Sequence, residues 1–245
     1  MQILVAAAIL LVLLSIGIPA YKLIRQNHYK ADTLARMKKI GQAVQTYTAQ
    51  TQGLLPDEDA KGQDTWESAA LPANATAWYN ALPKIWGGRA VGEYLNSPSE
   101  FYTPENNLYV PGADYPEKRK LEKPYFAIAM NTKLAVKDAQ GNKVALKMSD
   151  ITEPRRTVLF LEQGLRGETR SMDQQTKKDY DGAPKGSAKS FVARYRGKGW
   201  LLFADGHAED VAASDLLTET ARFPFPPGPD DVIWSAKPEV DPNKP

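Results

Sequence analysis

The side chains that most often carry out chemistry are scarce in this chain. Its 245 residues include no cysteine, and His28 and His207 are its two histidines. Without cysteine there is no disulfide framework, no thiolate zinc or iron–sulfur site and no cysteine nucleophile. Two histidines are also a poor supply for a multi-histidine metal site or for serine–histidine catalysis. The composition therefore argues against an enzyme.

The densest group of potential ligands follows Asp205-Gly206-His207, with Glu209 and Asp210 just beyond. Successive side chains of a strand point to opposite faces, so these groups would not converge on one ion. Asp-Gly between two extended runs instead indicates a hairpin, whose type I′ turn needs positive φ at both residues. We therefore predict a two-residue turn at Asp205 and Gly206, and no catalytic or cofactor-binding residue.

The elements that would position these residues begin with an uncharged segment from Met1 to Tyr21. As a helix it would be about 30 Å long, close to the hydrocarbon thickness of a bilayer. A secretory signal would need a basic start, which is missing. As a plain anchor the segment would leave the domain in the cytoplasm, because six of the seven charges between Lys22 and Lys39 are basic. A helix that first spans a membrane and later enters a protein assembly fits best.

Helical periodicity continues to a plausible C-cap near Gln52–Gly53, with Pro56 just beyond. The apolar stripe that should pack on a domain consists of Ile24, Leu34, Met37, Ile40, Val44 and Tyr47. We expect one helix of about 75 Å, with a projecting apolar half and a packed amphipathic half. Gly17 and Pro19 predict a kink or a meltable point in the projecting half.

The second half of the chain is typical of an antiparallel sheet. Runs rich in β-branched and aromatic residues predict strands at Tyr125–Met130, Thr157–Glu162, Phe191–Tyr195, Gly199–Ala204 and His207–Val211. The predicted fold class is α+β, a long N-terminal helix on an antiparallel sheet. We divide the chain into an apolar transmembrane and polymerisation helix (1–24), a globular domain (25–222) and a Pro-rich tail (223–245) that Trp234 ties down.

The apolar segment from Ile3 to Tyr21, with its proline at Pro19, resembles the N-terminus of type IV pilins and type II secretion pseudopilins. In that family a glutamate precedes the proline by 17 residues, and Gln2 occupies the corresponding position here. Later segments resemble pilin-like proteins with the "processing-associated" Asp-Gly C-terminal region, a prepilin family of Planctomycetes and Verrucomicrobia. The segments that carry this resemblance are Trp78–Leu82, Tyr125–Asn131, Pro154–Phe160 and Trp200–His207. Tyr195 stands ten residues before Asp205, where the family has a histidine.

The resemblance implies a pilin-like fold and a structural function without catalysis. A homo-oligomeric helical filament, either a type IV pilus or a secretion pseudopilus, would form through the N-terminal helix, with Gln2, Gly17 and Pro19 as assembly residues. Before assembly the subunit would lie in the bacterial inner membrane, after prepilin processing and methylation, and later in a periplasmic or extracellular filament. No nucleic-acid partner is expected.

Two alternatives stay open at this point. Some pseudopilins bind calcium in a C-terminal loop, which makes Asp230 and Asp231 minor metal candidates in a chain otherwise expected to need no cofactor. The second alternative is a monomeric, membrane-anchored extracytoplasmic binding module or hydrolase.

Overall fold

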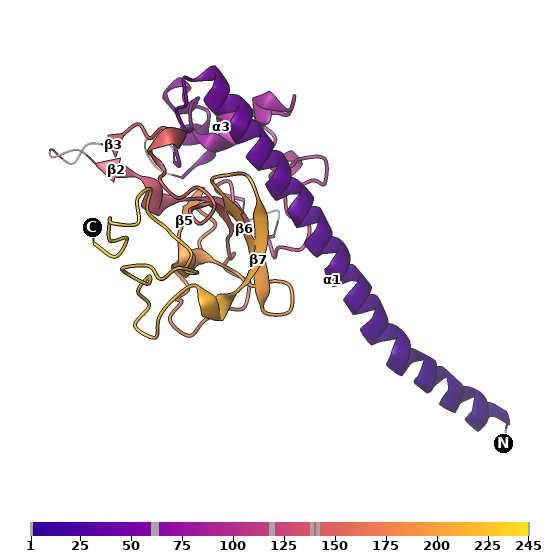
Figure 1. Cartoon of the computed structure of the whole chain (residues 1–245). Helices are drawn as coiled ribbons and strands as arrows, with labels where there is room; N and C mark the ends of the chain where they lie inside the picture. The colour runs from indigo at the N-terminus through magenta and orange to yellow at the C-terminus, as the bar shows by residue number, and fades with distance from the viewer. Residues whose placement is uncertain (1, 60–63, 118–120, 138–139, 141–142, 245) are drawn as a thin grey trace.

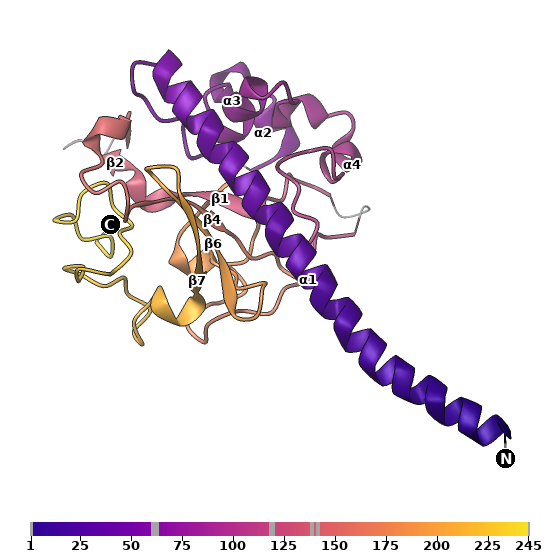
Figure 2. The same cartoon turned by 45° about the vertical axis from the view of Figure 1, so that its right-hand side comes forward.

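A computed structural model describes residues 2–59, 64–117, 121–137, 140 and 143–244, and for residues 2–14, 16, 136, 137 and 143 it describes the backbone alone. One long helix, α1 (Gln2–Gln50), runs from the N-terminus, and the remainder of the chain forms a body beside its C-terminal half (Figures 1 and 2). The N-terminal half of α1 points away from this body. The predicted arrangement of a projecting and a packed half is therefore observed.

The body contains short helices and a mixed sheet. The helices are α2 (Trp66–Ala69), α3 (Trp78–Ile85) and α4 (Pro98–Phe101). The strands are β1 (Ile128–Asn131), β2 (Val136–Lys137), β3 (Lys143–Val144), β4 (Val158–Glu162), β5 (Lys185–Gly186), β6 (Lys198–Phe203) and β7 (Ala208–Ala212). Five strands form one sheet in the order β5-β1-β4-β6-β7, while β2 and β3 pair separately.

The sheet is antiparallel except at one edge. Strand β1 pairs antiparallel with β4, β4 with β6 and β6 with β7, whereas β5 is parallel to β1. The fold class is α+β, as the sequence predicts, and four of the five predicted strands coincide with β1, β4, β6 and β7 within a few residues. The fifth prediction, a strand at Phe191–Tyr195, is wrong, because this segment makes only the isolated bridges of Phe191 with Gln163 and of Tyr195 with Lys198.

Both faces of the sheet are covered, by different parts of the chain. One face packs against α1 and α3 through a core that includes Met37, Ile40, Trp78, Phe160 and Leu202. The other face carries Leu161, Leu201 and Phe203 and is covered by the C-terminal tail, in which Trp234 is fully buried. The tail lies on the side of the sheet away from α1 (Figures 1 and 2). This double coverage explains why β4 is buried along its whole length.

The end of α1 follows the predicted C-cap. The helix stops at Gln50, and Gln52 and Gly53 adopt φ of 56° and 88°. The amide of Gly53 donates to the carbonyl oxygen of Thr48 at 2.8 Å, so it satisfies one of the free carbonyls of the last turn. A positive φ at this position favours glycine, which has no side chain to clash.

Candidate functional site

The described part of the projecting half of α1 presents its side chains to solvent from Gly17 to the body. From Gly17 to His28 every residue is exposed, and we call this segment the neck. Ile18, Tyr21 and Ile24 are 52%, 65% and 67% exposed, and their spacing of three places them along one side of the helix. Ile24 was predicted to begin the packed stripe, and this prediction is wrong, since packing starts near Tyr29. Several large apolar side chains in one exposed segment indicate a surface that a partner covers.

The predicted assembly residues all lie on this projecting helix. Gln2 is its first residue, but its side chain is outside the described part. Gly17 has open space where a side chain would extend, and Pro19 is exposed. The helix passes through both without ending, so in the free subunit no extended stretch interrupts it. A change of conformation at this point inside a filament stays a prediction.

In the part of the chain that the structure describes, no helix has both the length and the apolar character needed to cross a bilayer. The predicted membrane-spanning segment, residues 1–24, contains Met1, residues 2–14 and residue 16, whose side chains lie outside that part. The membrane-spanning role of this segment therefore stays a prediction.

Lys30 makes the first polar contacts between α1 and the sheet. Its Nζ lies 2.7 Å from Oδ2 of Asp210 on β7 and 5.3 Å from the ring centroid of Trp200 on β6. The indole N–H of Trp200 in turn donates to the backbone oxygen of Lys30 at 3.0 Å. Lys30 thus joins the base of the neck to two adjacent strands.

Acidification should loosen this attachment. The hydrogen bond from Lys30 lowers the pKa of Asp210 below its ordinary 3.8, against a smaller opposing effect of burial. A lowered folded-state pKa stabilises the fold above the ordinary value, and this contribution is lost as the pH falls through the folded-state pKa. We expect Asp210→Asn to cost about 0.2–1 kcal/mol at neutral pH in denaturant unfolding. The difference from the wild type should vanish at a pH that protonates Asp210, and a difference that persists there would contradict the assignment.

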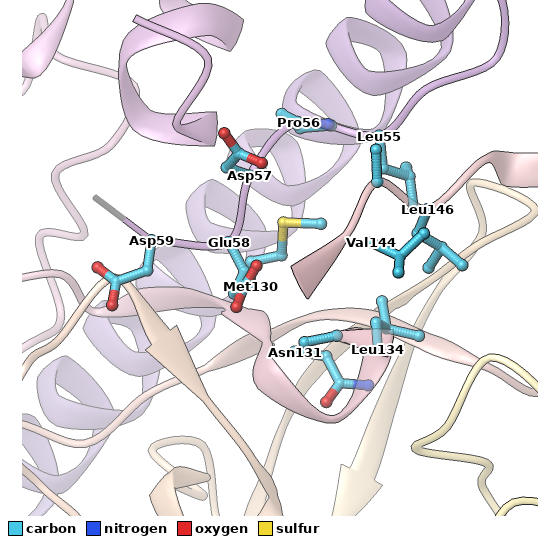
Figure 3. Close-up of a pocket in the computed structure, with 12 residues that line it drawn as sticks. Leu55, Pro56, Asp57, Glu58, Asp59, Met130, Asn131, Leu134, Val144 and Leu146 are labelled. Carbon is cyan, nitrogen blue, oxygen red and sulfur yellow. The ribbon is translucent and has the colours of Figure 1, made fainter. Parts of the chain in front are cut away.

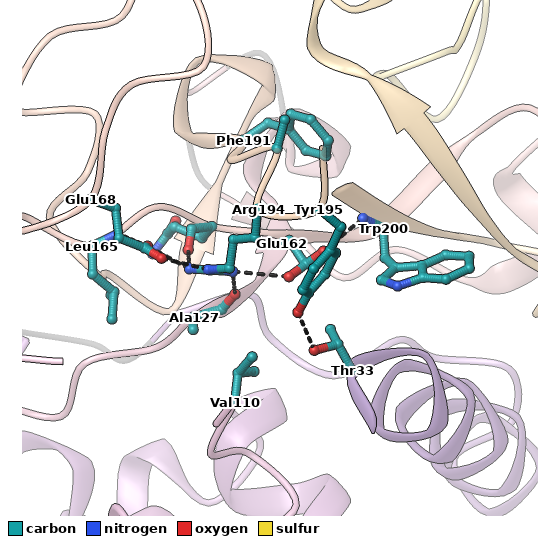
Figure 4. Close-up of polar contacts among 12 residues, drawn as sticks. Thr33, Val110, Ala127, Glu162, Leu165, Glu168, Phe191, Arg194, Tyr195 and Trp200 are labelled. Atoms are coloured by element: carbon teal, nitrogen blue, oxygen red, sulfur yellow. Dashed lines mark hydrogen bonds and ion pairs between the residues drawn. The ribbon is translucent and has the colours of Figure 1, made fainter. Parts of the chain in front are cut away.

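A buried hydrogen bond anchors α1 one turn further on. The hydroxyls of Thr33 and Tyr195 are 2.7 Å apart, and both side chains are buried (Figure 4). Burial, followed by the nearby charge of Glu162, raises the pKa of Tyr195, so its hydroxyl stays protonated and can donate. Tyr195 thus connects the turn before β6 to the helix.

Behind Tyr195 lies a buried ionic cluster of Arg194, Glu162 and Glu168 (Figure 4). The Arg194 guanidinium donates from Nε and Nη2 to the two Glu168 oxygens, each at 2.6 Å. Its Nη1 donates to Oε1 of Glu162 at 3.0 Å, and the backbone amide of Trp200 donates to Oε2 at 2.8 Å. The side chain of Glu162 is fully buried and that of Arg194 is 4% exposed. One guanidinium therefore bridges two carboxylates inside the body.

Burial and charge act in opposite directions in this cluster. Burial raises the pKa of Glu162, and the Arg194 charge and the Trp200 amide offset only part of that effect. For Arg194, burial favours the neutral form, but the charges of Glu168 and Glu162 outweigh it and raise the pKa of the guanidinium above its ordinary value. Arg194 is thus permanently charged, and it is the group that makes two buried carboxylates tolerable.

The turn between β6 and β7 contains Asp205 and Gly206, as predicted, but its type differs. The amide of Gly206 donates to the carbonyl oxygen of Phe203 at 2.9 Å. The amide of Phe203 donates to the carbonyl oxygen of His207, also at 2.9 Å. Positive φ occurs at Gly206 (92°) and not at Asp205. The loop is thus the three-residue kind, Ala204 to Gly206, rather than a type I′ pair. A type I′ signature occurs instead at Arg196 and Gly197, with φ of 56° and 79°.

His207 has a local role in this turn. Its Nδ1 lies 2.5 Å from Oδ1 of Asp205, and its ring stacks on Phe203 at 4.4 Å. Asp205 and His207 therefore contact each other across the turn.

Replacing Gly206 should destabilise the fold. Its φ of 92° is strained for other residues, and an added Cβ would lie 2.6 Å from Nε2 of Gln45 on α1. We expect Gly206→Val to cost more than about 1 kcal/mol in thermal or denaturant unfolding. His207→Ala should cost about 0.5 kcal/mol or less, since the ring is 40% exposed. Wild-type stability in the glycine variant would contradict this interpretation of the turn.

The minor calcium candidates lie in the tail. Oδ2 of Asp231 accepts the amide of Gly228 at 2.6 Å, and its carbonyl oxygen accepts from Arg156 Nη2 at 2.8 Å. Asp230 is exposed. No group of three acidic or histidine side chains that could hold a metal ion occurs within the described ranges.

A pocket of about 250 Å³ opens beyond the C-terminal end of α1 (Figure 3). Leu55, Met130 and Leu146 contribute apolar surface, and the carboxylates of Asp57 and Asp59 lie along one rim. Oδ2 of Asp57 accepts from Oγ1 of Thr76 at 2.7 Å, and Asp59 pairs with Lys185 of β5. The first contact attaches the segment after α1 to the loop before α3, and the second attaches it to the edge strand β5, so both have a structural role.

The sequence did not indicate the attachment residues Lys30, Thr33, Arg194, Tyr195 and Glu162. Glu162 carried one usable signal, since it is a charged residue that closes an otherwise apolar strand. Its partners are remote in sequence, so the signal did not identify them.

The architecture is pilin-like: a long N-terminal helix with exposed apolar side chains on its neck, packed on a mostly antiparallel sheet. Comparisons with protein-family models, with curated proteins and with solved structures found no match. The arrangement of α1 and the sheet thus defines the class of fold.

Proposed function

We propose that this chain is a structural subunit of a filament of the type IV pilus or type II secretion pseudopilus kind. The exposed neck supports the proposal most directly. It leaves the side chains of Ile18, Tyr21 and Ile24 exposed on a helix whose backbone continues to Gln2. A folded monomer gains nothing by exposing these side chains, whereas an assembled one buries them.

The mechanism is transfer of the helix from lipid to a bundle of identical helices. Lipid tails are as apolar as leucine, so close packing of the helices supplies the gain. Contacts between different surfaces of successive subunits do not close on themselves and generate a helical filament. The subunit would lie in the inner membrane before assembly and in a periplasmic or extracellular filament afterwards, and the proposal assigns it no enzymatic activity.

Gln2 would make the docking of a new subunit weaker than a glutamate does. In the family the glutamate is thought to pair with the N-terminal amine of a neighbouring subunit. A glutamine side chain can accept a hydrogen bond from that amine but cannot neutralise its charge. A Gln2→Glu variant that assembled faster would support this role.

Electron microscopy of sheared cell-surface material tests the proposal. Cells that produce the full chain should yield fibres in negative stain, and antibodies against the body should label them along their length. Membrane-bound monomers without fibres would instead favour the anchored binding module. Methylation at a newly generated N-terminus, found by intact mass, would further support the processing pathway.

A further inference from the structure

A groove in the body is separate from the neck and from the attachment residues. It has a volume of about 380 Å³ and lies between the end of α3 and the loop that follows α4. Its lining includes Trp86, Arg89, Tyr94, Glu100, Glu105 and Asn107. We call it the Trp86 groove, and all its lining residues belong to the described part of the chain.

Arg89 makes several contacts in this groove, and its side chain is 44% exposed. Its Nη1 donates to Oε2 of Glu100 at 2.5 Å, and its Nη2 donates to the carbonyl oxygen of Glu93 at 2.7 Å. The guanidinium carbon lies 4.2 Å from the ring centroid of Tyr94. A guanidinium with restrained rotamers loses little entropy when it hydrogen-bonds a ligand, and its remaining N–H groups can donate.

The backbone is shaped around the half-buried Trp86. Gly87 has a φ of 72°, and a Cβ at Gly88 would lie 2.6 Å from the indole nitrogen of Trp86. Two glycines in succession thus let the chain pass against the edge of the indole. On α1, Nζ of Lys39 lies 5.7 Å from the indole ring centroid. For the Trp86 indole N–H and the Asn107 side chain, no hydrogen-bond partner occurs among the described residues.

The charges of the Trp86 groove balance. Arg89 and Lys39 are offset by Glu100 and Glu105, and the side chains of Thr103 and Asn107 add neutral donors and acceptors. A wholly apolar ligand would desolvate these groups without replacing their hydrogen bonds. A phosphorylated or polyanionic ligand would meet the carboxylates of Glu100 and Glu105. A neutral molecule with many hydroxyls and one apolar face can replace the lost hydrogen bonds and brings no negative charge near the two carboxylates.

We propose that the Trp86 groove binds a short neutral saccharide. The C–H face of one sugar ring lies against the indole of Trp86, as apolar ring faces pack on aromatic side chains. The hydroxyls at the ring edge hydrogen-bond to Arg89, Glu105 and Asn107, which fix its orientation. This site does not depend on filament formation.

Titration of the full chain with three neutral trisaccharides tests the proposal. The protein is kept in a detergent without a sugar head group, and maltotriose, cellotriose and N-acetylchitotriose are added, with binding followed by saturation-transfer NMR and calorimetry. At least one should bind with a Kd on the order of 1 mM. Trp86→Ala should weaken that binding at least about fivefold and Asn107→Ala about threefold.

Asn96→Ala is the matched control, because Asn96 is exposed and does not line the groove. It should bind like the wild type. Denaturant unfolding of each variant shows whether it is folded. If Trp86→Ala does not fold, the affinity of Asn107→Ala for the trisaccharide tests the proposal instead. The proposal is overturned if no trisaccharide binds saturably at about 10 mM, or if the folded Trp86 and Asn107 variants bind with unchanged affinity. It is also overturned if trigalacturonate, an anionic trisaccharide titrated in the same way, binds more tightly than the neutral sugars.

Discussion

Cells that produce the Leu11→Asp variant are expected to form no filaments, in contrast to the filaments that the proposed function predicts for the wild-type chain. Leu11 lies in the middle of the uncharged N-terminal segment. A carboxylate at the bilayer centre costs about 2.5–3.5 kcal/mol on insertion scales, and in a dry bundle of identical helices it is repeated in every subunit without a partner. Negative-stain images of sheared material measure the filaments, and fractionation measures the chain left in the membrane.

Two controls separate assembly from folding. Leu11→Ala keeps the segment uncharged and should form filaments, and Leu71→Asp places the same charge on a body residue that is 51% exposed. Residues 25–245 alone should fold and remain monomeric by light scattering, because packing of α1 on the body begins near Tyr29. If this shortened chain polymerises as well as the full one, the N-terminal helix is not the assembly element.

The features that could be predicted from the sequence depend on local patterns. The 3.6-residue periodicity from Leu34 to Tyr47 specifies a helix and its buried face, and both Met37 and Ile40 are fully buried. Gly53 marks the helix end because few other residues accept its φ of 88°. The run at Thr157–Glu162 predicts β4 because β-branched and aromatic residues follow a proline there.

The errors arose where long-range contacts outweigh local preference. Phe191–Tyr195 has the composition of a strand, but it makes only isolated bridges with Gln163 and Lys198. Its Arg194 bonds to Glu162 and its Tyr195 to Thr33. The type I′ turn occurs at Arg196-Gly197 rather than at Asp205-Gly206, although arginine is an unusual residue at positive φ. No local sequence rule predicts which of these two dipeptides forms the type I′ turn.

The sequence indicates that Glu162 needs a partner, but it does not identify the other members of the ionic cluster. Glu162 is separated from Arg194 by 32 positions, and Glu168 lies in a polar loop that resembles any solvated segment. A charged residue at the end of an apolar strand requires a partner, yet the chain has 31 basic residues from which to choose. Only the fold selects Arg194.

The largest effect on stability is expected from Arg194→Met. This change removes the cation and leaves the buried carboxylate of Glu162 with the Trp200 amide but without a counter-charge, which costs about 3–5 kcal/mol. Denaturant unfolding of the full chain, followed by tryptophan fluorescence, measures the loss. Arg170→Met is the matched control, because Arg170 is exposed on the neighbouring loop, and it should change stability by less than about 0.5 kcal/mol.

The pH dependence of the Arg194→Met variant identifies the cause of its instability. Burial already raises the pKa of Glu162 above its ordinary 4.5 in the wild type, and loss of the Arg194 charge should raise it further. The folded state then holds a proton that the unfolded state releases, so stability is full below pH 4.5 and falls as the pH rises through the folded-state value. Glu162→Gln in the Arg194→Met background should remove this slope and recover part of the lost stability, because a neutral amide needs no counter-charge. A variant whose loss is independent of pH, with no rescue by the glutamine, would mean that Arg194 acts by packing rather than by charge.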